Sequence, residues 1–260
     1  MLLRDIGVYI KFVEKQHVQG TLKGEIHFEP LQNFRNLENN EGDEIIGDKF
    51  EGSRVYNIKK TDKISVGIYD EDNQINEWIP LHEVSGSINK GLNNLDIKSI
   101  GIASMFYLTC DKNFEMYNLD ESKGTCDLKL NEETLNDLQK FNDDKRTPIL
   151  IYDVFKFRKL LKKSGLSYGP IEYYDENDAK GFFNDNDPYL SGAFKKRNKY
   201  SNQKEFRIAN KLLNPNKSEE VRIGSLKNIA NSFDTVNDLN KFRILGSGLY
   251  TVDSNNQLES

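Results

Sequence analysis

The chain contains few of the residues that build disulfide frameworks and metal sites. Its 260 residues include two cysteines, Cys110 and Cys126, and three histidines. The cysteines form no CxxC pair, and a structural zinc site needs such ligands at short, regular spacing. We therefore expect no metal and no disulfide. Sparse use of cysteine is typical of a reduced protein, so the expected location is the cytoplasm.

Long apolar runs and the common phosphate-binding motifs are also missing. No segment is apolar for long enough to cross a bilayer, and charges interrupt the N-terminal hydrophobic stretch, so neither a membrane span nor a signal peptide is predicted. Neither GxxxxGK nor GxGxxG occurs, and no serine nucleophile elbow is predicted. The usual sequence support for a hydrolase, a nucleotide triphosphatase or a dehydrogenase is therefore absent.

The composition describes a polar but foldable chain. Charged residues make up 30% of the sequence, yet 15 Phe and 12 Tyr provide enough large apolar surface for a core. A formal net charge of −5 argues against a general nucleic-acid binder. A local basic patch nevertheless runs from Lys195 to Lys204.

Short strand signals outnumber helix signals, and the two kinds do not alternate strictly. This pattern predicts one α+β domain over residues 1–260, with a split, mainly antiparallel sheet and short flanking helices. The expected strands are 8–13, 24–28, 55–58, 63–69, 100–109, 147–152, 169–174, 204–208, 220–225 and 242–245. The expected helices are 31–37, 131–141, 154–163 and one or two turns within 226–233, followed by a frayed tail at 254–260.

Residues 53–98 differ in composition from their surroundings. Two short alternating runs lie there, 55–58 and 63–69, and the acidic, turn-rich segment 70–74 links the second run to Ile75. This pattern predicts a β-hairpin projecting from the body. We interpret 53–98 as a β-rich insertion within the single domain. Its deletion is expected to leave a folded remainder.

Three polar features outside this insertion have competing interpretations. The acids Asp43, Glu44, Asp48 and Glu51 could hold a hard cation, but their spacing matches no calcium loop, so a solvated loop is predicted. His27 lies within a strand and is interpreted as a structural histidine rather than a ligand or an acid. Cys110 follows an apolar strand and is interpreted as a small buried thiol rather than a nucleophile.

The segment 194–208 carries the strongest candidate for a site. A basic loop leads into an alternating strand, and alternation places Gln203, Glu205 and Arg207 on one face. A carboxylate beside an amide, with an arginine next to them, indicates either a solvated sheet edge or a site for a polar ligand. The residue types alone favour the solvated edge, because most charged strand positions face water.

Several short phrases resemble two families, and they occur in the same order along the chain. The phrases are 24–35, 48–51, 171–174, 200–207 and 221–224. Together they resemble an uncharacterised bacterial and phage family, although Tyr9-Ile10-Lys11 stands where that family has His-Tyr-Thr and the family's Asn-Asp-Pro-Phe turn is missing. The same order of parts is similar to the ADP-ribosyltransferase superfamily, which implies an ADP-ribosyltransferase-like fold and NAD as the cofactor.

The resemblance assigns a role to particular residues. Glu205 matches the catalytic glutamate and Gln203 the residue that orients the acceptor. The NAD-binding positions would be Tyr9 or Lys11 on the first strand, the aromatic Phe28 on the second, and Arg207 beside the glutamate. A carboxylate suits this chemistry, because breaking the bond between nicotinamide and ribose builds positive charge on the sugar.

Two functions follow as hypotheses. The first is an ADP-ribosyltransferase-like protein of a phage or bacterial defence or anti-defence system, which uses NAD to modify a host or phage protein or a nucleic acid. The alternative is a non-catalytic protein that binds and inhibits or senses another protein through the projecting 55–78 hairpin.

Overall fold

The computed structural model describes residues 7–41, 47–69, 74–120, 125–184 and 189–241. Its strands are β1 (Gly7–Glu14), β2 (Glu25–Pro30), β3 (Ser53–Ile58), β4 (Ile64–Tyr69), β5 (Ile75–Leu81), β6 (Gly86–Gly91), β7 (Ile100–Thr109), β8 (Phe114–Asp120), β9 (Thr125–Leu130), β10 (Arg146–Ile151), β11 (Ser167–Pro170), β12 (Glu172–Tyr174), β13 (Lys195–Arg197), β14 (Glu205–Lys211), β15 (Glu219–Arg222) and β16 (Ala230–Ser232).

The helices between these strands are short. The α-helices are α1 (Val18–Leu22), α2 (Leu31–Asn36), α3 (Asn94–Ser99), α4 (Cys110–Asn113), α5 (Glu132–Gln139), α6 (Val154–Lys163) and α7 (Ala179–Asn184). The 3-10 helices are η2 (Lys15–His17), η4 (Tyr189–Phe194), η5 (Asn198–Gln203) and η6 (Val236–Lys241), and η3 (Leu37–Glu41) is a π-helix. The protein is thus a mixed α+β fold, and among the paired strands only β12 and β13 run parallel. The α+β prediction and the mainly antiparallel sheet are confirmed.

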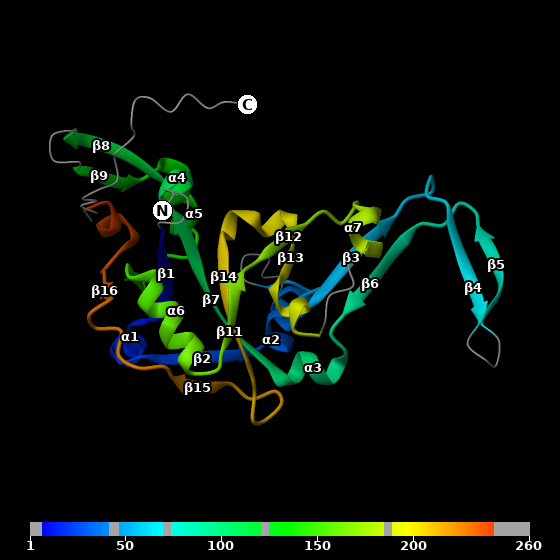
Figure 1. The fold of residues 1–260 in the computed structure, drawn as a ribbon, viewed down its shortest axis with the longest axis horizontal. Coiled ribbons are helices and arrows are strands. Elements are labelled where there is room, and N and C mark those ends of the chain that lie inside the picture. The colour runs from blue at the N-terminus through cyan, green and yellow to red at the C-terminus, as the bar shows by residue number, and fades with distance from the viewer. Residues whose placement is uncertain (1–6, 42–46, 70–73, 121–124, 185–188, 242–260) are drawn as a thin grey trace, which may run out of the picture.

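The central sheet forks around β7. In the order β11-β14-β7-β1-β10-β16, β7 pairs with β14 over residues 100–106, and on its other side with β1 over residues 106–109. Further along that second side, Gly101 and Ile102 of β7 pair with β2 instead. Between Ile102 and Phe106 the described chain therefore places no strand on this side, and β1 and β2 diverge there (Figure 1).

Both faces of the sheet are covered. On one face α6 and the segment around β15 and β16 enclose a core that includes Tyr9, Phe28, Phe157 and Phe206. On the other face two separate clusters form. One lies under β8, β9, α5 and η6 and includes Leu108 and Leu138, and the other lies against α2 and α3 and includes Leu31 and Ile97. The fork lies between these two clusters.

Elements with strong local signals match the sequence predictions closely. The apolar run 100–109 is β7, as predicted. Helix α6 also has the predicted bounds, since the Asp153 carboxylate accepts a hydrogen bond from the Lys156 N–H at its start, and Gly165, at φ +71°, follows its end.

Other boundaries were wrong. The expected strand 169–174 is two strands, β11 and β12, which pair with different partners. Part of the expected helical segment 226–233 is the strand β16, which extends the sheet beyond β10. The expected strand 242–245 and the tail 254–260 lie outside the described residues.

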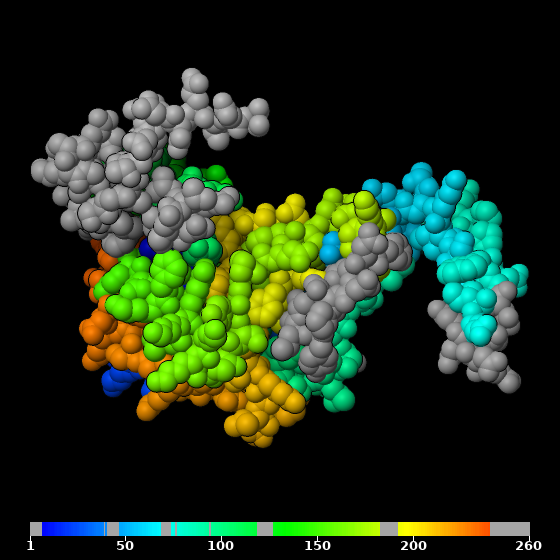
Figure 2. Space-filling view, in the orientation of Figure 1, coloured from blue at the N-terminus to red at the C-terminus, as the bar shows by residue number. Residues whose placement is uncertain are grey.

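The segment 53–98 begins and ends in the body and extends away from it between these ends. β3 pairs with β6, and beyond them β4 pairs with β5, which forms the long arm at the right of Figure 1. At the base of the arm, Val55 and Tyr56 are buried. The Tyr174 hydroxyl accepts a hydrogen bond from the Val55 N–H and donates one to the Ser53 carbonyl. The base is therefore packed into the fold, whereas the distal β4–β5 ribbon contacts little else (Figure 2).

None of the helices in the described part of the chain is both long enough and apolar enough to span a membrane.

Candidate functional site

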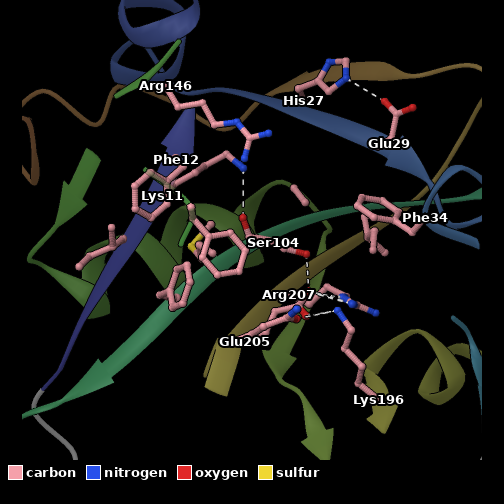
Figure 3. Close-up of a pocket in the computed structure, with 17 residues that line it drawn as sticks. Lys11, Phe12, His27, Glu29, Phe34, Ser104, Arg146, Lys196, Glu205 and Arg207 are labelled. Carbon is pink, nitrogen blue, oxygen red and sulfur yellow. Dashed lines mark hydrogen bonds and ion pairs between the residues drawn. The ribbon is translucent and has the colours of Figure 1, made fainter. Parts of the chain in front are cut away.

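A pocket of about 380 Å³ lies at the fork of the sheet (Figure 3). Its apolar wall comes from both clusters on that face, and its polar groups come from β1, β2, β7, β10, β13, β14 and the end of η5. The lining residues are Ile10, Lys11, Phe12, His27, Glu29, Phe34, Ile102, Ala103, Ser104, Met105, Phe106, Phe141, Arg146, Lys196, Gln203, Glu205 and Arg207. A hollow of this size, mostly apolar with a few convergent polar groups, is typical of a small-molecule site.

The floor of the pocket holds Glu205 and Arg207, which are neighbours on one face of β14. Arg207 Nε donates to Glu205 Oε1 at 2.8 Å, and Ser104 Oγ, from β7, donates to the same oxygen. Lys196 Nζ, from β13, lies 3.3 Å from Glu205 Oε2. Gln203 joins the group because its Oε1 accepts from Lys196 Nζ at 2.7 Å. The predicted Gln203, Glu205 and Arg207 are thus brought together.

A second carboxylate supports this floor from behind. Glu51, fully buried in the loop before β3, pairs with Arg207 through two contacts of 2.7 and 3.3 Å. Arg207 Nη1 also donates to the carbonyl of Ala193 at 2.5 Å. The guanidinium of Arg207 therefore bridges the two carboxylates, and it does so away from water, because Arg207 is only 1% exposed. It is a positioning residue in this structure.

The buried charges shift one another's pKa values. Burial alone would raise the pKa of Glu205, but the charges of Arg207 and Lys196 and the hydrogen bond from Ser104 lower it to about 2. Burial raises the pKa of Glu51, against the opposing charges of Arg207 and Lys196. Burial lowers the pKa of Arg207, but the charges of Glu205 and Glu51 outweigh this effect and raise it overall. Glu205 is therefore an ionised carboxylate at neutral pH.

The approach to β14 differs from the predicted alternating strand. Residues 198–203 form the 3-10 helix η5, and Lys204, at φ +44°, turns the chain into β14. Lys204 Nζ is held by the carboxylate of Asp137 at 2.6 Å. Gln203 therefore reaches the pocket from a helical turn, and the predicted alternation holds only from Glu205 onward.

The predicted solvated acidic loop is wrong for its second half. Asp48 and Glu51 are buried, and Asp48 Oδ1 accepts from Arg197 Nη2 at 2.7 Å. Arg197 also contacts Glu38 at 2.9 Å. These ion pairs fasten the loop before β3 to β13, so the acids are part of the structural support of the site. Asp43 and Glu44 lie outside the described residues.

The opposite side of the pocket mouth carries Lys11 and the pair His27–Glu29. Lys11 Nζ donates to the Ser104 carbonyl at 3.3 Å, and burial lowers the pKa of Lys11 to about 8. His27 Nε2 lies 3.1 Å from Glu29 Oε2. This hydrogen bond raises the pKa of His27 and lowers the pKa of Glu29 to about 2. His27 is therefore a half-exposed, paired residue at the rim.

Tyr9 and Phe28 are not brought to the pocket. Both are fully buried on the other face of the sheet, in the core beneath α6. The Tyr9 hydroxyl accepts a hydrogen bond from Arg158 Nε at 2.6 Å, and burial raises its pKa. Of the four expected NAD-binding residues, Lys11 and Arg207 line the pocket.

Several site residues gave no usable signal in the sequence. Ser104 lies inside the most apolar run, and Arg146 is one of 36 basic residues, whereas Lys196 belongs to the basic patch 195–204. A hydroxyl in the middle of an apolar central strand is the feature that could have indicated Ser104. The sequence also contains a G-x-S-x-G match at 165–169, but Ser167 is exposed on the edge strand β11 and does not lie at a strand-to-helix turn, so it is no nucleophile elbow.

Comparison with protein-family models, curated proteins and solved structures finds no match to this chain. The similarity to ADP-ribosyltransferases therefore stays a prediction. Within the described ranges, no group of three or more His, Cys, Asp or Glu side chains is placed to hold a metal ion.

Proposed function

We propose that the fork pocket binds NAD and that the protein transfers its ADP-ribosyl group to a macromolecule, as part of a phage or bacterial defence or anti-defence system. The observation that carries this proposal is the fixed, ionised Glu205 carboxylate on the pocket floor. NAD would supply a ribose whose bond to nicotinamide breaks with both electrons leaving on the nicotinamide. A carboxylate that is already desolvated and oriented stabilises the positive charge left on the sugar.

Glu205 has capacity left for a ligand. A carboxylate offers about four acceptor positions. Arg207 and Ser104 occupy those of Oε1, and Lys196 occupies one of the two on Oε2. The remaining position can accept a hydrogen bond from a ribose hydroxyl. Because its pKa is about 2, Glu205 suits charge stabilisation rather than proton donation.

The other pocket groups fit the remaining parts of a dinucleotide. Phe12, Phe34 and Phe106 provide apolar surface for a planar ring. Lys11 can donate hydrogen bonds to phosphate oxygens, and Arg146 places positive charge at the mouth. Gln203 is held by Lys196 next to Glu205, and we assign it the role of orienting the acceptor group.

The test is release of nicotinamide from NAD. Glu205→Gln should lower the rate at least ~10²-fold. Because Glu205 is buried beside two cations, this variant also loses stability, so Ser104→Ala provides a milder second perturbation that keeps the charge. Glu115→Gln, on the exposed β8–β9 hairpin, is the matched control and should keep the wild-type rate. Equal rates in all folded variants would contradict the assignment of Glu205.

A second candidate function rests on the β4–β5 ribbon. Large apolar side chains are exposed there, among them Trp78 at 61%, Val66 at 48% and Ile68 at 45%. An isolated two-stranded ribbon is only marginally stable in water, and exposed apolar patches mark interaction sites. On this alternative the protein binds another protein through the ribbon. Photo-crosslinking from position 78 in producing cells should then capture a discrete partner, and Val66→Glu should abolish that capture.

A further inference from the structure

Lys11 occupies an unusual place at the fork. It is paired with Ile149 of β10, but the pairing of β1 with β7 stops one residue earlier, at Ile10. Its side chain therefore extends into the gap where β1 and β2 diverge, and it ends at the Ser104 carbonyl (Figure 3). Tyr9, two residues earlier, still faces the closed core.

The side chain of Lys11 is partly buried, and no carboxylate of the described residues pairs with its amine. None of the ion pairs within the part of the chain that the structure describes involves Lys11. By contrast, the buried cations Lys196 and Arg207 pair with the carboxylates of Glu51 and Glu205. Burying a charged amine without a counter-ion is costly, so enclosure favours the neutral form. A neutral amine can donate one N–H to the Ser104 carbonyl and keep its lone pair directed elsewhere.

This amine is accessible from two cavities. Lys11, Phe12 and His27 line both the fork pocket and a second hollow of about 330 Å³ on the other side of the gap. A ligand of small-molecule size can therefore reach the nitrogen. Arg146 lines the fork pocket beside Lys11 and adds a positive charge there, although it also pairs with Asp143 at 3.5 Å. The second hollow is instead lined by Glu14, Glu25 and Glu220, so an anionic group of the ligand is expected on the side of the fork pocket.

We infer that Lys11 is an imine-forming lysine, which binds an aldehyde or ketone that carries an anionic group. The lone pair of the neutral Nζ attacks the carbonyl carbon and forms the C–N bond, while the carbonyl π-electrons move to oxygen. Proton transfer from nitrogen to this oxygen gives a carbinolamine, which then loses one molecule of water and leaves a C=N bond. No oxidant or reductant takes part. This inference does not rest on NAD binding, although its ligand would occupy part of the pocket that we propose for NAD.

Pyridoxal 5′-phosphate is a suitable probe, because it carries both an aldehyde and a phosphate. The protein is treated with about one equivalent at pH 7.5, reduced with borohydride, digested and mapped by mass spectrometry. We expect at least ~10-fold higher labelling of the Lys11 peptide than of the Lys156 peptide, because Lys156 is exposed to water and its amine is paired with the Asp153 carboxylate, which favours the charged form. Comparable labelling of the two peptides overturns the inference.

The Lys11→Arg variant separates imine formation from simple attraction of the phosphate. The arginine carries a positive charge that attracts the phosphate but cannot form an imine, so the label at position 11 and the imine absorbance should both disappear. If this variant proves unfolded by circular dichroism, the pH profile of the wild type decides. The labelling rate of Lys11 should reach half its maximum near pH 8, and a rate that rises only near pH 10 refutes the inference.

Discussion

The buried ion pairs at positions 51, 205 and 207 act on stability as well as on the site. Two carboxylates and the guanidinium of Arg207 lie within one hydrogen-bonded group with Lys196. Such groups add little net stability when complete, but removing one member leaves a buried charge uncompensated. Replacing Glu205, whose side chain is 6% exposed, should therefore lower the melting temperature as well as alter the site.

Arg207→Met should lower the free energy of unfolding by about 3–5 kcal/mol, because Glu51 and Glu205 lose their shared cation. The measurement is urea unfolding followed by circular dichroism. Arg222→Met is the matched control, since Arg222 pairs with Glu25 at the surface and is 79% exposed. Similar shifts of the unfolding midpoint in both variants would contradict this prediction, because the buried pairs would then contribute no more to stability than a surface ion pair.

The pair His27–Glu29 predicts a pH dependence. The folded pKa of Glu29, about 2, lies below its unfolded value of 4.5, so the stability that Glu29 contributes is present above pH 4.5 and is lost as the pH falls toward 2. The pKa of His27 is raised, so its contribution is present below pH 6.5 and fades as the pH rises. The difference in melting temperature between wild type and Glu29→Gln should therefore shrink between pH 5 and pH 2. A difference that stays constant over this range would contradict the pairing.

Among the elements, α6 shows how a local signal fixes a boundary. Asp153 Oδ1 accepts the hydrogen bond from the Lys156 N–H at 2.9 Å, and α6 covers the core that contains Tyr9. Asp153→Ala should cost about 1 kcal/mol, the usual value for a lost N-cap. Asp153→Asn keeps an acceptor oxygen and should cost clearly less. Equal losses in thermal melts of the two variants would argue against capping.

The arm divides into a structural base and a dispensable ribbon. Replacing residues 59–85 with Asn-Gly joins β3 to β6 beyond the pair Ile58–Gly86 by a two-residue turn. Because β4 and β5 pair only with each other among the described strands, the shortened protein should stay folded and monodisperse, with a melting temperature within a few degrees of wild type.

Deleting the whole of 53–98 should have a different result. That change removes Val55, Leu92 and Ile97, which are buried in the body. We expect an insoluble or unfolded product, assessed by size-exclusion chromatography. A folded product would mean that the base of the arm is also an appendage.

On the scale of the molecule, the features that can be predicted from the sequence are those set by residues close together in the chain. The run 100–109 and the cap at Asp153 carry their own signals, so β7 and α6 are predicted closely. The burial of Asp48 and Glu51 depends on Arg197 and Arg207, which lie 149 and 156 positions away. No local pattern contains that information, and a solvated loop was therefore the natural expectation.

The candidate site was predictable to a similar extent. Glu205 and Arg207 share a strand face, as alternation requires, whereas the left-handed turn at Lys204 places Gln203 on a helix. Tyr9 and Lys11 share a strand face too, but the fork opens between them, so one lies in the core and the other in the pocket. The fork arises from the divergence of β1 and β2 along β7, which only the complete sheet shows.

The central claim, that the fork pocket binds NAD, is tested most directly by calorimetric titration. Three folded proteins are compared: the wild type, the chain shortened at 59–85, and Ser104→Leu, whose larger side chain fills the pocket beside Glu205. The account predicts saturable heat with the first two and none with Ser104→Leu. No saturable heat with folded wild type at millimolar NAD, or unchanged binding by Ser104→Leu, would contradict it.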